Sequence, residues 1–394
     1  MTFSYSHFTN SNKWTSSAVN YTLTDNTRAL AALAANPDYR YDAAYGVKAM
    51  GLSYATLIDS AFDTLLAPVG LTAFEDRGWT NISQVNITFA LVKGFTSDEG
   101  ALDGAKFGNP AAGNVVVIYD VDDIQNTTAG IGNDYQIILH EIGHALGLSL
   151  GDGQHPHQVA PEENYTHDNT IMSYIDGSVA KGSSYLGNTY VSGDRDAATP
   201  MIYDIATLQK LYGVKTTDVT DSYTPTGAKQ AWTLWDGGTD VDTLDVSGLS
   251  WSSGQPGAKL DLRGGVDGNN VPRFMEIKDE RIAIAFDPRH YTGGDITQPL
   301  LSGKSGVVDI EIAKGGAGND TIIGGYVANT LQGGAGNDKV YDPSSKTISG
   351  DYLYGDTPGS TLAGGNDTLW GGSNTFLYGG GGANDNATCT RIAG

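Results

Sequence analysis

This chain of 394 residues has few cysteines, few cationic side chains and no long apolar segment. A single cysteine, Cys389, excludes an internal disulfide framework. Lys and Arg together number 23 against 45 Asp and Glu, and the net charge of −22 argues against nucleic acid or an anionic membrane surface as a partner. No apolar run approaches about 18 residues, so we expect no membrane span. The first residues lack the pattern of a cleaved signal peptide.

Glycine is abundant and unevenly distributed. Of the 53 glycines, 33 lie in residues 214–394. Chains of this length usually form two hydrophobic cores instead of one. Apolar residues continue at regular spacing beyond Gly213, so the change in composition indicates a second domain and not a linker. We therefore predict two domains, residues 1–213 and 214–394.

Residues 140–148 read H-E-I-G-H-A-L-G-L and carry the strongest chemical signal. The preceding residues have apolar side chains at helical spacing, and Gly147 supplies a stop. On a helix, positions four apart lie about 6 Å apart, so His140 and His144 can bind one metal ion. Glu141 faces the same side and can take a proton from water at that ion. The pattern predicts a zinc site.

A zinc hydrolase needs a third protein ligand. In metzincin proteases, which this motif resembles, the pattern continues as H-E-x-x-H-x-x-G-x-x-H, but Leu150 stands where the last His belongs. The sequence 147–149 followed by His155 resembles the family's G-L-S-H-P with five residues inserted. His155 is therefore the first candidate. His157 and Asp152 are alternatives, as is a site with no third ligand.

Residues 169–174 read N-T-I-M-S-Y and resemble the Met-turn of the serralysin branch of the metzincins. That resemblance implies that Met172 lies beneath the zinc ligands and that Tyr174 is a switchable ligand and oxyanion donor. Residues 199–213 and 113–120 also resemble serralysin elements. The implied fold is an α+β metzincin-like catalytic domain followed by an all-β parallel β-roll or sandwich domain.

The second domain has a period of nine. Residues 315–323 and 333–341 both fit G-G-x-G-x-D-x-U-x, the RTX repeat, and residues 324–332 keep its length with Asn in place of Asp. Each unit is a turn followed by a short strand, whose apolar residue points inward. Two units form one coil of a parallel roll, so Asp320 and Asp338 stack near the strand spacing of about 4.8 Å. Calcium between the stacked carboxylates removes their repulsion.

Calcium ligands are expected in these turns and in one earlier loop. Residues 235–245 resemble the acidic loop W-D-x-G-G-x-D-T with which serralysins open this domain, with one extra residue here. Degraded repeats follow at 362–370 and 371–373. The candidate calcium ligands are Gly316, Gly318, Asp320, Gly334, Gly336, Asp338, Asp236 and Asp242.

The resemblance implies a secreted zinc endopeptidase with one catalytic zinc ion and several structural calcium ions. Glu141 would be the general base. It further implies one-step export from a Gram-negative bacterium, an extended protein or peptide substrate, and a proteinaceous inhibitor as a further partner. The rival hypothesis is a proteolytically silent relative that acts as an extracellular binding or adhesion module. Leu150 is the residue that supports the rival.

Overall fold

A computed structural model describes most of the regular secondary structure of the chain. The described residues are 13–23, 46–48, 50–76, 84–93, 115–120, 132–148, 166–173, 195–215, 221–237, 240–251, 256–265, 273–285, 309–342, 350–359, 364–372, 374–382 and 384–389. The chain divides into two compact units, one spanning Ser4–Lys215 and the other containing Thr216–Gly394.

The first unit contains a mixed sheet. Its strands are β1 (Ala18–Leu23), β2 (Gly46–Lys48), β3 (Thr72–Glu75), β4 (Ile87–Lys93) and β5 (Val115–Asp120). They run in the order β2-β4-β1-β3, and β5 also pairs with β4. The β1–β3, β1–β4 and β4–β5 pairs are parallel, whereas β2 runs antiparallel to β4.

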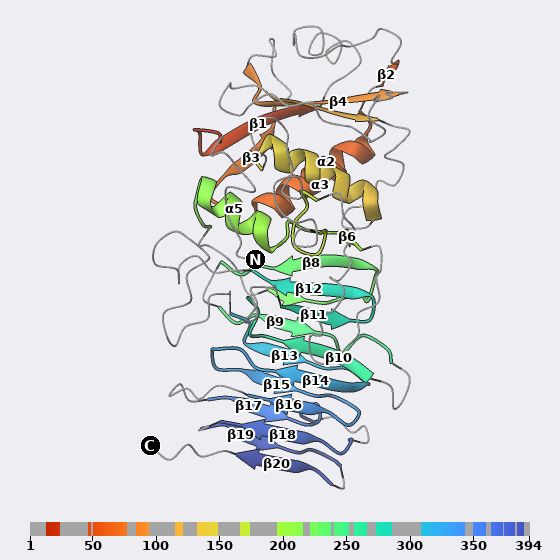
Figure 1. Cartoon of the computed structure of the whole chain (residues 1–394), viewed down its shortest axis with the longest axis vertical. Helices are drawn as coiled ribbons and strands as arrows, with labels where there is room; N and C mark the ends of the chain where they lie inside the picture. The colour runs from red at the N-terminus through yellow and green to blue at the C-terminus, as the bar shows by residue number, and fades with distance from the viewer. Residues whose placement is uncertain are drawn as a thin grey trace. The chain divides into compact units, whose positions relative to one another are not determined.

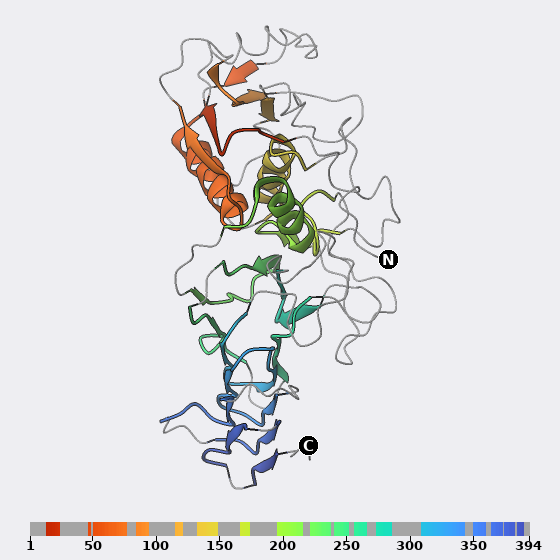
Figure 2. The ribbon, with the colours of Figure 1, turned by 90° about the vertical axis from the view of Figure 1, so that its left-hand side faces the viewer.

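Two of the three described helices of the first unit, α2 (Leu52–Leu66) and α3 (Gly132–Ala145), contact this sheet (Figures 1 and 2). The third is α5 (Ile202–Tyr212), and the two-residue strand β6 (Asp196–Ala197) contacts α3. Phe62 of α2 stacks on Tyr21 and meets Phe89 edge to face, and Phe89 stacks on Tyr119 of β5. These rings are all buried. They fix the sheet against α2, which contacts α3.

The second unit is a coil of strands that belong alternately to two sheets (Figure 1). Its strands are β7 (Ser222–Tyr223), β8 (Gln230–Leu234), β9 (Thr243–Asp245), β10 (Pro256–Asp261), β11 (Phe274–Ile277), β12 (Glu280–Ile284), β13 (Ile312–Lys314), β14 (Asn319–Ile323), β15 (Thr330–Gln332), β16 (Lys339–Tyr341), β17 (Tyr352–Tyr354), β18 (Thr368–Gly371), β19 (Phe376–Tyr378) and β20 (Asn386–Cys389).

One sheet contains β20-β18-β16-β14-β10-β11-β12-β8 in that order, and the other is β19-β17-β15-β13-β9-β7. From β13 onward all neighbours are parallel, and Thr321 pairs with Lys339, 18 residues later. The apolar residues Ile322, Leu331 and Val340 are fully buried, as the repeat predicts. From β13 onward the second unit is thus a parallel roll with an apolar core, whereas β10, β11 and β12 pair antiparallel in one sheet.

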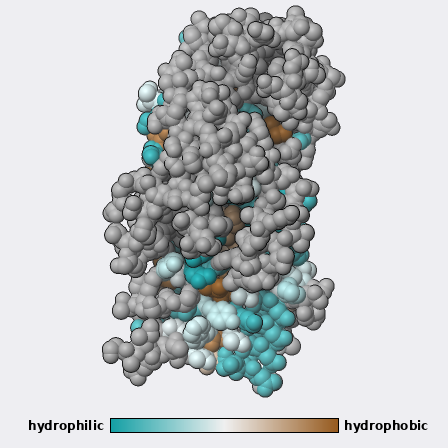
Figure 3. All heavy atoms as spheres, viewed as in Figure 1, coloured by the Kyte–Doolittle hydropathy of each residue, from teal (hydrophilic) through white to brown (hydrophobic). Residues whose placement is uncertain are grey.

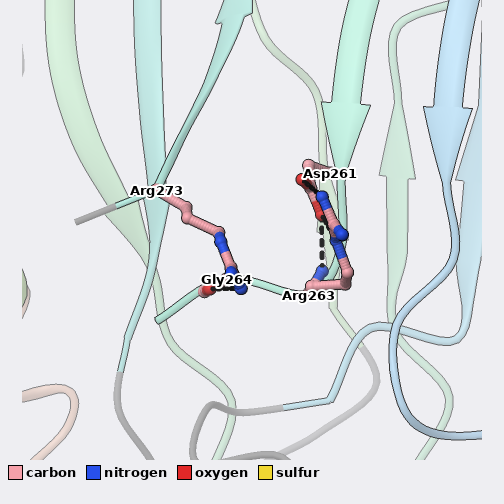
Figure 4. Close-up of polar contacts among 4 residues, drawn as sticks. All are labelled: Asp261, Arg263, Gly264 and Arg273. Carbon is pink, nitrogen blue, oxygen red and sulfur yellow. Dashed lines mark hydrogen bonds and ion pairs between the residues drawn. The ribbon is translucent and has the colours of Figure 1, made fainter. Parts of the chain in front are cut away.

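An ion pair between the partly exposed Arg263 and the buried Asp261 fixes the turn after β10 (Figure 4). The guanidinium of Arg263 donates through Nε and Nη2 to the two carboxylate oxygens of Asp261, at 2.8 and 2.5 Å. Arg273 approaches from β11, and its Nη1 donates to the carbonyl oxygen of Gly264 at 3.3 Å. The two parallel hydrogen bonds from Arg263 compensate the free-energy cost of burying the charge of Asp261.

The described surface at the C-terminal end of the roll is mainly hydrophilic or near neutral in the space-filling view (Figure 3). Aromatic rings nevertheless form ladders on this part of the roll. Tyr352 stacks on Phe376 and Tyr354 stacks on Tyr378, with ring centroids 5.0 and 4.8 Å apart. Their faces contact one another between successive coils, so they stabilise the coil. Among the described helices, none is long and apolar enough to cross a membrane.

Candidate metal centres

The predicted zinc helix is α3, and it brings His140 and His144 together. Their ring centroids lie 4.7 Å apart with the planes at 85°, and both side chains are buried. Glu141 is buried on the same helix. The helix ends at Ala145, and Gly147 follows with a φ of 97°. Gly147 therefore supplies the left-handed residue that the sequence predicted at the helix end.

Backbone carbonyls orient both imidazoles. Nδ1 of His140 lies 2.7 Å from the carbonyl oxygen of Ile171, and Nδ1 of His144 lies 2.9 Å from that of Leu148. A carbonyl oxygen can only accept, so each Nδ1 must carry the proton. Each Nε2 then carries a lone pair, which is the tautomer that a histidine needs to bind a metal ion. The pair therefore fits a zinc ion.

The Met-turn packs directly against α3 at Gly143. A Cβ added at Gly143 would lie 3.0 Å from Sδ of Met172 and 3.1 Å from Cδ1 of Ile171. Met172 is buried. Gly143 lies directly before His144 on α3, so the turn and the helix can approach closely only because this residue has no side chain. Sequence reasoning did not assign a role to Gly143, although its position inside the H-E-x-x-H motif was visible.

A buried carboxylate connects the Met-turn to α5. Asp204 accepts hydrogen bonds from the hydroxyl of Thr170 at 2.7 Å, the amide of Ile171 at 2.8 Å and the amide of Met201 at 2.8 Å. Burial raises the pKa of Asp204 to about 7, against the opposing effect of these hydrogen bonds. The carbonyl of Ile171 in turn holds His140. Asp204 and His140 are thus connected through a single residue, Ile171.

Replacing Asp204 with asparagine is expected to destabilise the first unit. The carboxylate of Asp204 now accepts hydrogen bonds from three donors, and the side-chain NH₂ of asparagine would face at least one of them. Two donors cannot bond to each other, and a buried donor without a partner costs about 1–3 kcal/mol. Urea unfolding of the full chain measures the change. The matched control is Asp63→Asn on the exposed face of α2. Equal midpoints for the two variants would contradict a supporting role for Asp204.

A third buried histidine, His167, contacts the end of the turn and is not grouped with His140 and His144. Nε2 of His167 lies 2.8 Å from the side-chain amide of Gln136, one helical turn before His140, and 2.9 Å from the carbonyl oxygen of Ser173. Within the described ranges, no group of three or more His, Cys, Asp or Glu side chains forms a metal-binding cluster. The remaining predicted residues, Asp152, His155, His157 and Tyr174, lie outside the described residues.

The RTX turns stack as predicted. The backbone amide of Asp320 donates to Oδ1 of Asp338 at 2.7 Å, so the two carboxylates follow one another along the roll. Burial raises the pKa of Asp320 to about 6 and that of Asp338 to about 8, and for Asp338 the neighbouring carboxylates add to the effect. The largest cause of both shifts is the removal of these carboxylates from water, which disfavours the charged form.

The predicted turn glycines are required for two different reasons. Gly334 and Gly336 have φ values of 110° and 132°, which other residues rarely adopt. At Gly316, an added Cβ would lie 2.7 Å from the ring of Trp251. At Gly318 it would lie 2.7 Å from Cα of Gly257. The chain therefore approaches itself closely on both turns.

The earlier acidic loop forms part of the same roll. Asp242 is buried, its Oδ1 accepts from the amide of Asp221 at 2.7 Å, and its own amide donates to Glu311 at 2.9 Å. Burial raises the pKa of Asp242 to about 7, and the carboxylates of Asp236, Glu311 and Asp221 add to this shift. Sequence reasoning identified Asp236 and Asp242. It missed Glu311, which is 69 residues away in sequence and outside the repeat pattern.

Comparison with known proteins finds one matching repeat family and several related proteins. The RTX calcium-binding nonapeptide repeat matches residues 314–341. The chain is 32% identical to the metalloprotease AprA of Pseudomonas entomophila over 52% of this chain and 40% of that protein. It is 32% identical to the serralysin of Proteus mirabilis over 52% of this chain and 38% of that protein. It is 28% identical to the serralysin of Photorhabdus laumondii over 64% of this chain and 50% of that protein.

These matches confirm the predicted resemblance. The chain carries RTX calcium-binding repeats and is related to metalloproteases, among which it resembles the serralysins. The matched region spans about 40% of the length of the first two relatives and half of the third.

Proposed function

We propose that the chain is a secreted, calcium-stabilised zinc endopeptidase. In this proposal residues 1–213 form the catalytic domain and residues 214–394 form a calcium-binding β-roll. The observation that carries this proposal is the pair of buried imidazoles on α3, in which each Nδ1 is hydrogen-bonded to a backbone carbonyl. Glu141 is buried on the same helix. The metalloprotease names of the relatives support the activity.

His140, His144 and His155 would hold the zinc ion, with Met172 packed beneath them. Zinc, when bound, lowers the pKa of its water to about 7 and polarises a carbonyl group. Glu141 accepts the proton of the attacking water and returns it to the leaving amine. Tyr174 donates a hydrogen bond to the oxyanion. The peptide lies extended against the edge of a strand.

Calcium would bind the acidic turns of the roll. Gly316, Gly318, Gly334 and Gly336 would supply carbonyl oxygens, with carboxylates from Asp320, Asp338, Asp236 and Asp242. The donor set is rich in oxygen, which suits calcium. The RTX match of residues 314–341 supports calcium binding, and the similarity to serralysins supports an extracellular location.

Purified full-length chain tests both proposals. Metal analysis after dialysis should find one zinc ion per chain and several calcium ions. Hydrolysis of casein should stop when zinc is removed and return when zinc is restored. A chain that binds zinc and cleaves no peptide would overturn the protease proposal.

Removing the imidazole of His155 is expected to weaken zinc binding at least 100-fold, because only two of the three proposed protein ligands, His140 and His144, would remain. Metal titration of three variants, His155→Ala, His157→Ala and Asp152→Ala, measures this effect. The last two are the matched controls on the same inserted segment. If only His157→Ala or only Asp152→Ala releases zinc, that residue is the third ligand and His155 is not.

The rival function is a binding or adhesion module without protease activity. Leu150 favours it, since the third histidine of the uninterrupted motif would stand there. Weak zinc binding in the parent chain, with no effect of any of the three substitutions, would support this rival.

A further inference from the structure

The turns of the roll differ between its two sides. One side, here called the aspartate side, contains the turns that end at Asp320, Asp338, Asp367 and Asp385. The other side, here called the asparagine side, contains the turn 324–329, which ends at Asn329. Both kinds of turn connect the same two sheets, β13 to β14 on the first side and β14 to β15 on the second (Figure 1).

On the aspartate side the carboxylates form a continuous ladder. The amide of each Asp donates to Oδ1 of the Asp one coil further on, at 2.7 Å for Asp320 to Asp338 and at 2.8 Å for Asp338 to Asp367. The second oxygens, Oδ2 of Asp338 and of Asp367, are buried and have no hydrogen-bond partner in the described structure. Both residues are 1% exposed. A buried carboxylate oxygen in this situation requires a cation or a proton.

Asn329 has the same place in its own turn. Its amide donates to Oδ1 of Asp351 one coil further on, at 2.7 Å, as the amide of Asp320 does on the opposite side. Its side-chain Oδ1 accepts from the amide of Gly325 at 2.8 Å, and this bond corresponds to the one from Gly316 to Asp320 at 2.7 Å. The backbone framework of a calcium turn is therefore retained.

The difference lies in the side-chain atom that faces the preceding coil. In Asp320 this atom is Oδ1, which accepts from the amide of Ala258, whereas in Asn329 it is Nδ2, which donates. Nδ2 of Asn329 donates to the carbonyl oxygen of Ile310 at 2.9 Å and lies 3.5 Å from that of Glu311. Both carbonyls belong to the preceding coil. Carbonyl oxygens at such a position are the ligands that calcium uses in a turn. Here the partially positive amide hydrogens approach them, and these hydrogens would repel a cation.

We propose that Asn329 replaces a calcium ion on the asparagine side, so that the turn 324–329 is held by its own side chain. This inference rests on calcium binding by the aspartate side, as proposed above. The roll would then bind calcium at this level on one side only. In this coil the turn 324–329 remains ordered by hydrogen bonds, and the turn on the aspartate side depends on the ion.

Two reciprocal substitutions in the full chain test the proposal, with calcium chloride as the ligand. Asn329→Asp is expected to bind one more calcium ion than the parent and to melt at a lower temperature in chelator, because its carboxylate would face the carbonyl of Ile310. Asp338→Asn is the matched control on the aspartate side. It is expected to bind at least one ion fewer. Isothermal titration and equilibrium dialysis measure the number of ions.

A folded Asn329→Asp chain that binds the same number of ions as the parent would overturn the proposal. A crystal structure of the parent in excess calcium provides a test that does not depend on the folding of a variant. An ion bonded to Asn329 would also overturn it, whereas ions beside Asp338 and none at Asn329 would support it. A parent chain that binds no calcium at all would instead refute calcium binding by the roll, which is a distinguishable result.

Discussion

Glu141→Gln is expected to reduce peptide hydrolysis at least 100-fold while leaving zinc bound. General acid–base catalysis contributes about 10²–10⁴ in rate, and the substitution removes the proton acceptor with little change of shape. Glu141 is buried on α3 between the two histidines in sequence, so glutamine fits the same space. Burial raises the pKa of Tyr119 on β5, and the negative charge of Glu141 raises it further.

The measurement is kcat/KM on a fluorogenic peptide, together with zinc content and the unfolding midpoint. Glu75→Gln on β3 is the matched control, since it removes a carboxylate of the same unit from another element. Residual activity above a tenth of the parent would refute a general-base role for Glu141. Loss of zinc from the variant would show instead that this residue supports the metal site.

The local parts of this structure were predictable, because the signal for each lies within a few residues. The apolar spacing before His140 and the stop at Gly147 predicted α3, and the two histidines meet there. The period of nine predicted the stacking of Asp320 on Asp338 and the inward direction of Ile322. In each case a fixed spacing determines which side chains share a face.

The supporting contacts were not predictable in the same way. Asp204 reaches a turn 33 residues earlier in sequence, and Glu311 reaches Asp242 across 69 residues. No periodic pattern connects such pairs, so only the folded chain identifies them. Asn329 was visible in the sequence as a departure from the repeat. The hydrogen bond that its side chain makes could not be predicted, because the acceptor is the carbonyl of Ile310 in the preceding coil.

Removing calcium is expected to open the roll while the first unit stays folded. Without the ions, buried carboxylates such as Asp338 and Asp367 follow one another with no counter-ion. A ligand that binds only the folded state, at 100 times its Kd, adds about 2.7 kcal/mol per independent site. Hydrogen exchange of the full chain, followed by mass spectrometry, should show loss of protection in β13–β18 after chelation. The amides of α5 are the internal control.

The pH dependence of the roll should reverse its sign between chelator and calcium. Burial raises the pKa of Asp320 and of Asp367 to about 6 and that of Asp338 to about 8. In chelator the folded roll therefore binds protons more tightly than the unfolded chain does. The stability that this contributes is fully present below about pH 4, the ordinary pKa of Asp, and is lost as the pH rises through 6 to 8.

The unfolding midpoint of the roll in chelator should consequently rise when the pH is lowered from 8 to 5. In saturating calcium it should fall over the same range, because protons and calcium compete for the same oxygens. Asp338→Asn removes the group with the highest of these pKa values, so it should flatten the chelator curve most between pH 7 and 8. Curves that run in the same direction in both solutions would mean that calcium does not bind these carboxylates, and the ladder of aspartates would then be held by protons alone.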